Sequence, residues 1–393
     1  MSASNDIEGE RQDILANCYS LRIYDNELLT FALYYEGLAG LQSKILSINN
    51  ELTYLFPIDL ETDGSNIVAW LKNRVIPKNR TFADEILKTF GLSHNDTKGI
   101  IDICKELSLN DSYWVVPIDF DGKFKQFNLY ENDFSEILSS VAYTGIESKD
   151  KAFSISPELT TNGALPKAWR NIKGEGIYLY KGGSSGGANT GKEPYSEYYA
   201  YQIAKAMELD AVEYDLERWK GILASKCRLF TNIDTSFVPA SKIIKKGGLK
   251  TCLDYYNDTI SKEAGEEFKS MLVFDAVIYN EDRHYNNFGL LRDNKTGRIM
   301  RPAPIFDNGI SLFSNAMPND FKNLEEIAKT KGNPYDIPYK MICKEVIGST
   351  QRKQLMKLLN FTFSLHPTIN LPQERLKAIE TQIKRRVNEL LNL

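Results

Sequence analysis

The spacing of apolar residues changes along the chain, and its first part mixes helical and strand-like patterns. Residues 82–90 and 99–107 place apolar side chains at helical intervals. Residues 114–120 are typical of a strand, and residues 123–129 are predicted to be its hairpin partner across the Asp-Gly pair between them. We find no chemical cluster in residues 1–145, which we interpret as a mixed α/β structural or partner-binding domain.

A second region is predicted to be rich in strands. Residues 176–181, GIYLYK, alternate apolar and polar positions and therefore predict a strand. A glycine-rich loop follows at 182–191, then a helix over about 195–209, and then a strand over 222–230. We expect residues 146–235 to form a small lobe built on these elements.

The third region, residues 236–393, carries nearly all helical signals. Its last segment is the clearest, because its apolar residues recur at intervals of three and four: Leu376, Ile379, Ile383, Val387 and Leu390. Lys384, Arg385 and Arg386 are expected to form the solvated face of this helix and not a nucleic-acid site. The predicted fold class is therefore α/β (α+β), with a mixed N-terminal domain, a strand-rich lobe and a helical lobe.

Composition narrows the classes of protein to consider. The 393 residues include 48 basic and 52 acidic side chains, a balance that gives no overall attraction to nucleic acid or to an anionic membrane. No apolar run approaches the roughly 20 residues that span a bilayer, and the polar start lacks the organisation of a signal peptide. The five scattered cysteines suit a reducing compartment. We expect a cytoplasmic protein with no membrane association and no direct nucleic-acid binding.

The densest polar cluster is NEDRHYNNFG at residues 280–289. Asp282, His284 and Asn287 follow an apolar helical stretch, and Asp307 comes after a short predicted hairpin. Phosphoryl transfer needs a carboxylate at the acceptor hydroxyl and oxygen ligands that hold magnesium against the phosphates. Each residue alone is more typical of a turn. Together, in this order, they favour phosphoryl transfer.

A phosphoryl-transfer site also needs a cation on the phosphates, held by a carboxylate. Lys181 ends the strand GIYLYK, and Glu197 lies in the first turn of the next predicted helix. A lysine at a strand end is usually a solvated charge, but strand, lysine, loop and glutamate-bearing helix follow in the order that such a pair requires.

A loop rich in hydroxyl groups precedes this strand. It contains Ser154, Ser156, Thr160, Thr161 and Gly163. Backbone amides and hydroxyls in such a loop can bind phosphates, although serine and threonine also occur in ordinary turns.

A second loop has the spacing of a Walker A motif but lacks its chemistry. Gly186, Gly191 and Lys192 give G-x-x-x-x-G-K, but Glu193 stands where a serine or threonine should bind magnesium, and Pro194 follows. A carboxylate there would repel phosphates. We therefore interpret this loop as a flexible connection.

These motifs resemble those of the HipA-like kinases, bacterial protein kinases best known as toxins of toxin–antitoxin pairs. Asp282, His284 and Asn287 match the motif D-x-H-x-x-N, and Asp307 and Lys181 match the later metal aspartate and the strand lysine. Residues 196–199, SEYY, are similar to the N-E-Y-Y helix start of the family. The resemblance covers roughly residues 150–320. It implies a two-lobed, protein-kinase-like fold with a strand-rich N-lobe over 146–235 and a helical C-lobe over 236–393.

The resemblance also implies a role for each matching residue. Asp282 would be the catalytic base, with His284 in the same catalytic motif, and Asn287 and Asp307 would be the Mg²⁺ ligands. Lys181, paired with Glu197, would contact the phosphates of ATP. The remaining implied ATP contacts are the loop from Ser154 to Gly163 for the phosphates and the backbone near Arg228 to Phe230 for the adenine. The autophosphorylated residue of the family would fall among Ser154, Ser156, Thr160 and Thr161.

The stretch SPELTTNGALPKAW departs from the Gly-Ala-Gln-Glu-Lys loop of the best-known members. It is more similar to the smaller, stand-alone HipA-related kinases, so the resemblance favours kinase activity, with a protein substrate, over a toxin role with an antitoxin partner. Two other functions stay open. One is a lipid or small-molecule kinase, because Asp282 to His284 with Asn287 and Asp307 also resembles the phosphoinositide kinase pattern. The other is a pseudokinase or partner-binding module.

Overall fold

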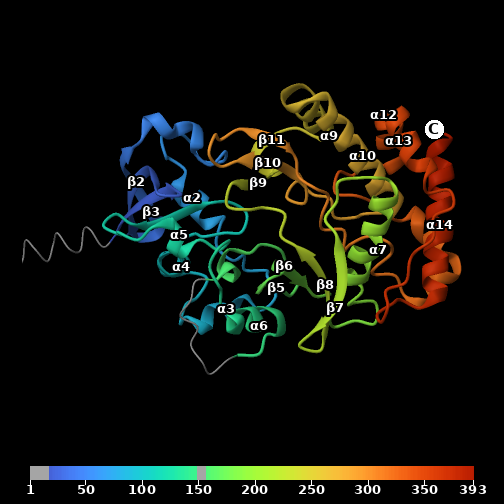
Figure 1. The fold of residues 1–393 in the computed structure, drawn as a ribbon, viewed down its shortest axis with the longest axis horizontal. Helices are drawn as coiled ribbons and strands as arrows, with labels where there is room; N and C mark the ends of the chain where they lie inside the picture. Colours follow the sequence, from blue (N-terminus) through green and yellow to red (C-terminus); the bar gives the residue numbers. More distant parts are fainter. Residues whose placement is uncertain (1–16, 148–155) are drawn as a thin grey trace, which may run out of the picture.

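The computed structural model describes residues 17–147 and 156–393, so the predicted loop residue Ser154 lies outside the described residues. The described parts form a mixed α/β protein with antiparallel sheets, as predicted. An N-terminal sheet lies at one end of the molecule, a central sheet follows, and helices fill the other end (Figure 1). No helix within the described ranges is long and apolar enough to span a membrane.

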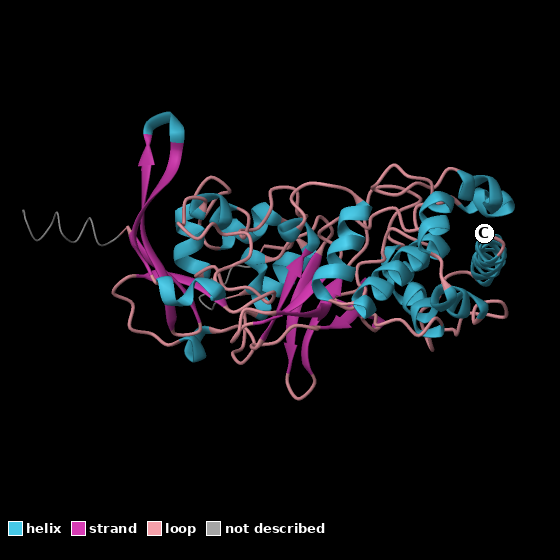
Figure 2. Ribbon diagram, turned by 90° about the horizontal axis from the view of Figure 1, so that it is seen from above, coloured by secondary structure: helices cyan, strands magenta, loops and turns pink. Residues whose placement is uncertain are grey.

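The N-terminal sheet has four antiparallel strands in the order β3-β2-β1-β4. Its strands are β1 (Cys18–Ile23), β2 (Asn26–Glu36), β3 (Gly40–Ile48) and β4 (Tyr113–Pro117). The hairpin of β2 and β3 projects from the rest of the molecule (Figure 2). The base of the sheet packs against α2 (Ile67–Lys72) through buried side chains that include Phe31 and Trp70.

The predicted hairpin between residues 114–120 and 123–129 is wrong in its second strand. Residues Phe124–Phe127 form a short helix, α5, and β4 pairs instead with β1. Phe124 packs edge-on against Trp114, with ring centroids 5.6 Å apart, and its backbone N–H donates to Asp25. The apolar residues of this segment therefore pack against a face of β4. They do not pair with the edge of β4 as a second strand.

The two helices predicted in the N-terminal region are confirmed as α3 (Ala83–Thr89) and α4 (Thr97–Cys104). With α6 (Glu136–Thr144) they pack onto the central sheet. Ile86 and Val141 share one buried cluster with Ala168 and Tyr180, so side chains from both sides of the predicted boundary at residue 146 form a common core.

The central sheet has the order β5-β6-β8-β7 and is antiparallel throughout. Its strands are β5 (Lys167–Ile172), β6 (Gly176–Lys181), β7 (Tyr214–Trp219) and β8 (Ile222–Arg228). The predicted strands at 176–181 and 222–230 are confirmed as β6 and β8, and the predicted helix as α7 (Glu193–Ala206). One face of α7 joins the core of the C-terminal helices, which links the sheet to that core.

A third sheet lies almost entirely within residues 236–393, which were predicted to form a helical lobe. It has the order β11-β10-β9, with β9 (Thr235–Pro239), β10 (Gly289–Asp293) and β11 (Ile299–Pro302). The helices of this region are α8 (Ala240–Ile243), α9 (Leu249–Asp254), a π-helical turn at Tyr255–Ile260, α10 (Lys262–Ile278), α11 (Leu324–Lys329), α12 (Tyr339–Val346), α13 (Ser349–Met356) and α14 (Gln373–Leu391).

Helix α14 confirms the clearest sequence pattern. The five residues predicted for its apolar face, Leu376, Ile379, Ile383, Val387 and Leu390, are all buried. Of the basic residues predicted to form its solvated face, Arg385 is exposed and pairs with Glu325. The prediction is wrong for Arg386: its side chain is only 12% exposed, because it stacks on Tyr279 and donates to the carbonyl of Ala276 at 3.2 Å.

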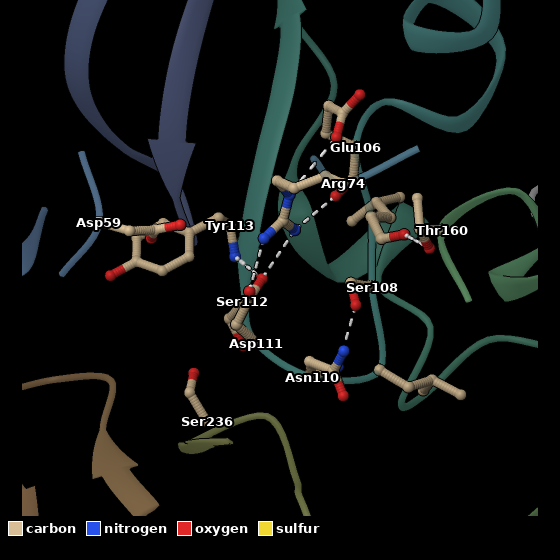
Figure 3. A network of polar contacts seen from close by, with 12 residues as sticks. Asp59, Arg74, Glu106, Ser108, Asn110, Asp111, Ser112, Tyr113, Thr160 and Ser236 are labelled. Carbon is tan, nitrogen blue, oxygen red and sulfur yellow. Dashed lines mark hydrogen bonds and ion pairs between the residues drawn. The ribbon is translucent and has the colours of Figure 1, made fainter. Parts of the chain in front are cut away.

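A buried polar network joins the N-terminal region to the rest of the molecule (Figure 3). Arg74 donates through both terminal nitrogens to Asp111, at 2.6 and 2.9 Å, and stacks on Trp70. Its Nε atom lies 3.4 Å from the Glu106 carboxylate, which is fully buried. One guanidinium thus faces two buried carboxylates. Burial, and the negative charge of Asp111, raise the pKa of Glu106 to about 8 although Arg74 opposes the shift.

Residues 105–113 carry part of this network and also contact the segment before β5, the connection after β8, and β9. The carbonyl of Leu107 accepts a hydrogen bond from the Thr160 hydroxyl at 2.7 Å. The carbonyl of Asn110 accepts from the backbone N–H of Phe237 at 2.8 Å, and the Ser112 hydroxyl donates to the carbonyl of Ile233 at 2.6 Å. The N-terminal region therefore fixes the segment between β8 and β9 and the short helix before β5.

Candidate functional site

The site is centred on Lys181, the last residue of β6. Its ammonium group donates to Glu197 of α7 at 3.1 Å and contacts Asp307, which follows the third sheet. Glu197 is fully buried, and its second oxygen accepts from the backbone N–H of Asn308 at 2.7 Å. The structure thus brings together Lys181 and Glu197, which are 16 residues apart, with Asp307, which is 126 residues from Lys181.

The charges of this cluster depend on one another. Burial alone would lower the pKa of Lys181, but Asp307 and Glu197 outweigh that effect and raise it. Burial would raise the pKa of Asp307, but Lys181 and then Lys167 outweigh it and lower the pKa to about 2. Lys181 and Asp307 are therefore both charged at neutral pH, whereas burial raises the pKa of Glu197.

Asp307 has a left-handed backbone conformation, with a φ of 55°. Its backbone N–H donates to the Tyr214 hydroxyl at 3.1 Å, and its neighbour Phe306 packs on Phe230 and Phe237 at ring-centroid distances of 5.4 and 5.3 Å. Non-glycine residues in this region are uncommon, and they persist where the surroundings determine the conformation. Packing on one side and hydrogen bonds on the other hold the Asp307 carboxylate beside Lys181.

The loop after α10, residues 280–287, holds the second group of predicted residues. Asn280 accepts from the Asp282 N–H at 3.0 Å. The Asp282 carbonyl then accepts from the His284 N–H and from the Asn287 side chain, both at 2.8 Å. Because Asn287 uses its amide nitrogen in this bond, its side-chain oxygen remains for another ligand. The sequence prediction of an Asp-His-Asn loop beyond a helix is confirmed in this arrangement.

The Asp282 carboxylate is half-buried, with 45% of its side chain exposed, and lies 3.9 Å from His284 Nε2. Burial raises its pKa, and the negative charge of Asp307 adds to the shift, while His284 and Lys181 oppose it. Asp282 therefore lies within the electrostatic influence of the Lys181–Asp307 pair, although it belongs to a different loop.

Arg283 connects these two loops and was not singled out from the sequence. Its buried guanidinium pairs with Asp275 of α10 at 3.0 Å and donates to the Asn287 carbonyl at 2.8 Å. It also donates to the carbonyl of Phe306 and to the side chain of Asn308. The sequence does contain one sign of this buried ion pair. Asp275 is a carboxylate within the otherwise apolar end of a helix.

Comparisons with known proteins find similar proteins both by sequence and by structure. No family model matches the chain. A 135-residue segment, 31% of this chain, is 29% identical to the serine/threonine-protein kinase CtkA of Helicobacter pylori and spans 41% of that relative's length. The crystal structure of CtkA, a Helicobacter pylori proinflammatory kinase, has a TM-score of 0.48 over 59% of this chain and 92% of its own, at 19% identity.

A second structure covers nearly the whole chain. It is a chain in the complex of the Shewanella oneidensis MR-1 toxin–antitoxin system HipA, HipB and its operator DNA. The TM-score is 0.54 and the identity 12%, over 95% of this chain and 99% of the other. The chain has a HipA-like fold. The sequence similarity to a serine/threonine-protein kinase supports the expectation drawn from the motifs.

In this HipA-like fold, the loop predicted to bind phosphates is fixed by the N-terminal region. Residues Pro157–Thr160 form a short 3-10 helix, and both its N-cap residue, Ser156, and its last residue, Thr160, are buried. The Thr160 hydroxyl donates to Leu107, as described above, and the Thr161 hydroxyl donates to the carbonyl of Pro157 at 2.7 Å. The assignment of Ser156, Thr160 and Thr161 to phosphate binding stays a prediction.

Lys167 is a second residue that the sequence analysis missed. It pairs in register with Lys181 across β5 and β6, and its ammonium group donates to the Asn162 carbonyl at 2.9 Å. Burial and the charge of Lys181 lower its pKa to about 7, although Asp307 opposes the shift. Gly163, at a φ of 95°, lies against this ammonium group, since a Cβ there would be 2.0 Å from Nζ. Lys167 is recognisable only once the strand register is known.

The loop with Walker A spacing surrounds a carboxylate. Glu193 is buried and accepts a hydrogen bond from the Ser184 hydroxyl. A Cβ at Gly183 would lie 2.8 Å from its second oxygen, which has no hydrogen-bond partner among the described residues. A carboxyl group thus occupies the inside of this loop, an arrangement unsuited to phosphate groups.

The segment predicted to contact adenine begins at Arg228, the last residue of β8. Arg228 is exposed, whereas Phe230 is half-buried against Phe306 and Phe237. The aromatic cluster thus connects this segment directly to the residue before Asp307. Its contact with adenine stays a prediction.

The donor set fits magnesium bound together with a nucleotide. Among the described residues, no group of three His, Cys, Asp or Glu side chains gathers as metal ligands. Asp307 and Asn287 offer one carboxylate and one amide oxygen on loops joined by Arg283. Magnesium is commonly held by one or two protein oxygens, with substrate phosphates and water completing the octahedron. These two residues would hold the ion, which would neutralise charge on the phosphates.

Proposed function

We propose that the chain is a HipA-like serine/threonine protein kinase that transfers the γ-phosphoryl group of ATP to a protein hydroxyl. The observation that carries this proposal is the contact of Lys181 with both Glu197 and Asp307, beside the loop of Asp282 and Asn287. Phosphoryl transfer depends mainly on positioning and on electrostatic stabilisation, for which this cluster supplies fixed charges.

In the proposed reaction, Lys181 binds the phosphates and Glu197 keeps its ammonium group in place. Asp307 and Asn287 hold magnesium, which supplies positive charge against the phosphate oxygens. Lys167 adds a second cation beside Lys181 once phosphates favour its charged form. ATP contacts near Arg228 to Phe230 complete the nucleotide site.

Asp282 is proposed to accept the proton of the attacking hydroxyl. Its carboxylate is partly exposed, so that a substrate can reach it, and burial raises its pKa toward the range useful to a general base. His284 lies 3.9 Å from the same carboxylate, and we propose that it contacts the substrate.

We also propose autophosphorylation within residues 154–161 and, for the whole protein, a cytoplasmic toxin role with an antitoxin partner. The HipA-containing structure includes HipB, which supports a search for such a partner. Because Ser156 and Thr160 are buried, their modification requires the short helix to leave its contacts with Leu107 and Arg80. A phosphoryl group would add about −1.5 to −2 charges and repel the ATP phosphates.

Incubation with γ-labelled ATP and magnesium tests the proposed function. Purified protein should transfer label to itself or to proteins of a bacterial lysate, and the label should be on serine or threonine. Parallel lipid vesicles containing phosphoinositides should stay unlabelled. Transfer to lipid alone would contradict a protein kinase, and no transfer under any condition would contradict a kinase.

A further inference from the structure

A pocket of about 330 Å³, which we call the Tyr335 pocket, opens beside the proposed catalytic loop. Its lining includes Gly248 and Leu249 at the start of α9, His284 and Tyr285 of the loop, and Tyr335 and Ile337 of a later segment. His284 connects the pocket to the site, because its Nε2 atom lies 3.9 Å from the Asp282 carboxylate. The His284 side chain thus lies next to both the pocket and the proposed base, Asp282.

The far wall of the pocket is held in place by the catalytic loop. The Tyr335 hydroxyl donates to the carbonyl of Arg283, and the Tyr339 hydroxyl donates to that of Asn280. Lys331 pairs with Glu281 at 2.6 Å. Three side chains from residues 331–339 therefore bond to consecutive parts of the loop that carries Asp282, so the pocket keeps a fixed relation to that carboxylate.

The lining is largely apolar and aromatic. The rings of Tyr285 and Tyr335 lie 6.0 Å apart, and His284 is the one titratable imidazole, ammonium or carboxylate group that faces the pocket among the described residues. At about 330 Å³ the pocket is at the small end of ligand sites, which suits a single large side chain better than a second cofactor.

We propose that the Tyr335 pocket binds an apolar side chain of the protein substrate, close in sequence to the hydroxyl that is phosphorylated. This inference rests on the proposed kinase function and adds a substrate class to it: extended segments with Leu, Ile, Met or Phe within two residues of the acceptor. A side chain bound there would position the adjacent hydroxyl at Asp282. Apolar pockets distinguish side chains by about 10–200-fold, which sets the expected selectivity.

Two glycines provide a matched pair of variants. Gly248 has extended backbone angles (φ −114°), and a Cβ at this position would meet nothing within 4 Å. Gly248→Leu therefore adds a side chain to the pocket lining without a backbone clash. Gly332 also has open space around its Cβ position but does not line the pocket. Gly332→Leu is the control on the neighbouring segment.

The test uses serine peptides with leucine or aspartate at each of the two positions before and after the serine. With magnesium-ATP, wild-type protein should phosphorylate the leucine form about tenfold faster or more at one position. Gly248→Leu should lose that preference and Gly332→Leu should keep it. Equal rates at every position, or an unchanged preference in Gly248→Leu, would overturn the proposal while leaving the kinase assignment intact.

A second variant and a binding measurement make the result independent of turnover. Ile337→Asp changes a partly exposed lining residue and should shift the preference from leucine to lysine.

Fluorescence anisotropy of the labelled peptides with Asp282→Asn protein needs no phosphoryl transfer. If no peptide is phosphorylated, the proposed function fails, but weaker binding of the leucine peptide to Gly248→Leu than to Gly332→Leu in that background would still support the pocket. Equal affinities would overturn it.

Discussion

Asp282 and Asp307 lie in the same site but have different electrostatic surroundings. Asp307 contacts Lys181, which with Lys167 lowers its pKa to about 2, whereas burial raises the pKa of Asp282. When the surroundings of two carboxylates shift their pKa values apart, the two groups commonly have different roles in the reaction. This difference fits the proposed roles of Asp307 as a magnesium ligand and of Asp282 as the proton acceptor.

Asp282→Asn should abolish phosphoryl transfer and leave ATP binding nearly unchanged. The amide cannot accept the proton, while Lys181, Asn287 and Asp307 still hold the nucleotide and its metal. Loss of a positioned base typically lowers the rate by about 10²–10⁴-fold. Rates from labelled ATP and affinities from calorimetry check both statements, and near-normal turnover would exclude Asp282 as the base.

Arg283→Met should destabilise the protein strongly. The change leaves Asp275 buried without its partner and frees the carbonyls of Asn287 and Phe306. Removal of one member of a buried ion pair typically costs about 3–5 kcal/mol. Urea unfolding of wild type and variant measures the loss, and the double variant Asp275→Leu, Arg283→Met should recover part of it. A single variant as stable as wild type would contradict this role for Arg283.

At the scale of elements, the sequence correctly predicted the helices and strands whose apolar residues have a clear periodicity. β6, α7, β8 and α14 were found because alternating or helical spacing persists over each of them. Residues 123–129 were misassigned because Phe124 is fixed by Trp114 and Asp25, which are distant contacts. Lys167 and Arg283 were missed for the same reason, since one depends on strand register and the other on Asp275.

Glu106→Gln should change how stability depends on pH. Burial raises the pKa of Glu106 from 4.5 to about 8 in the folded protein, so the folded state binds a proton that the unfolded state releases. The free energy of unfolding of wild type should therefore decrease as pH rises through this window. The glutamine variant lacks this contribution and should gain stability relative to wild type between pH 5 and pH 9. Parallel unfolding curves in the two proteins would contradict the raised pKa.

At the scale of the whole molecule, the N-terminal region supports the site, to which its described residues, 17–147, contribute no predicted side chain. Segment 105–113 bonds to Thr160, to Phe237 and to Ile233, so it holds both the helix before β5 and the connection between β8 and β9. The sequence suggested a structural or partner-binding role for this region. The contacts favour a structural role, because both anchored segments flank the Lys181 strand.

The central claim is that Lys181, Asn287 and Asp307 bind magnesium–ATP, and Asp307→Ala tests it most directly. A methyl group cannot replace a carboxylate ligand of a hard cation. Calorimetric titration of ATP, with and without magnesium, should show that the metal strengthens ATP binding to wild type and has much less effect on Asp307→Ala. An equal effect of magnesium on both proteins would contradict the account.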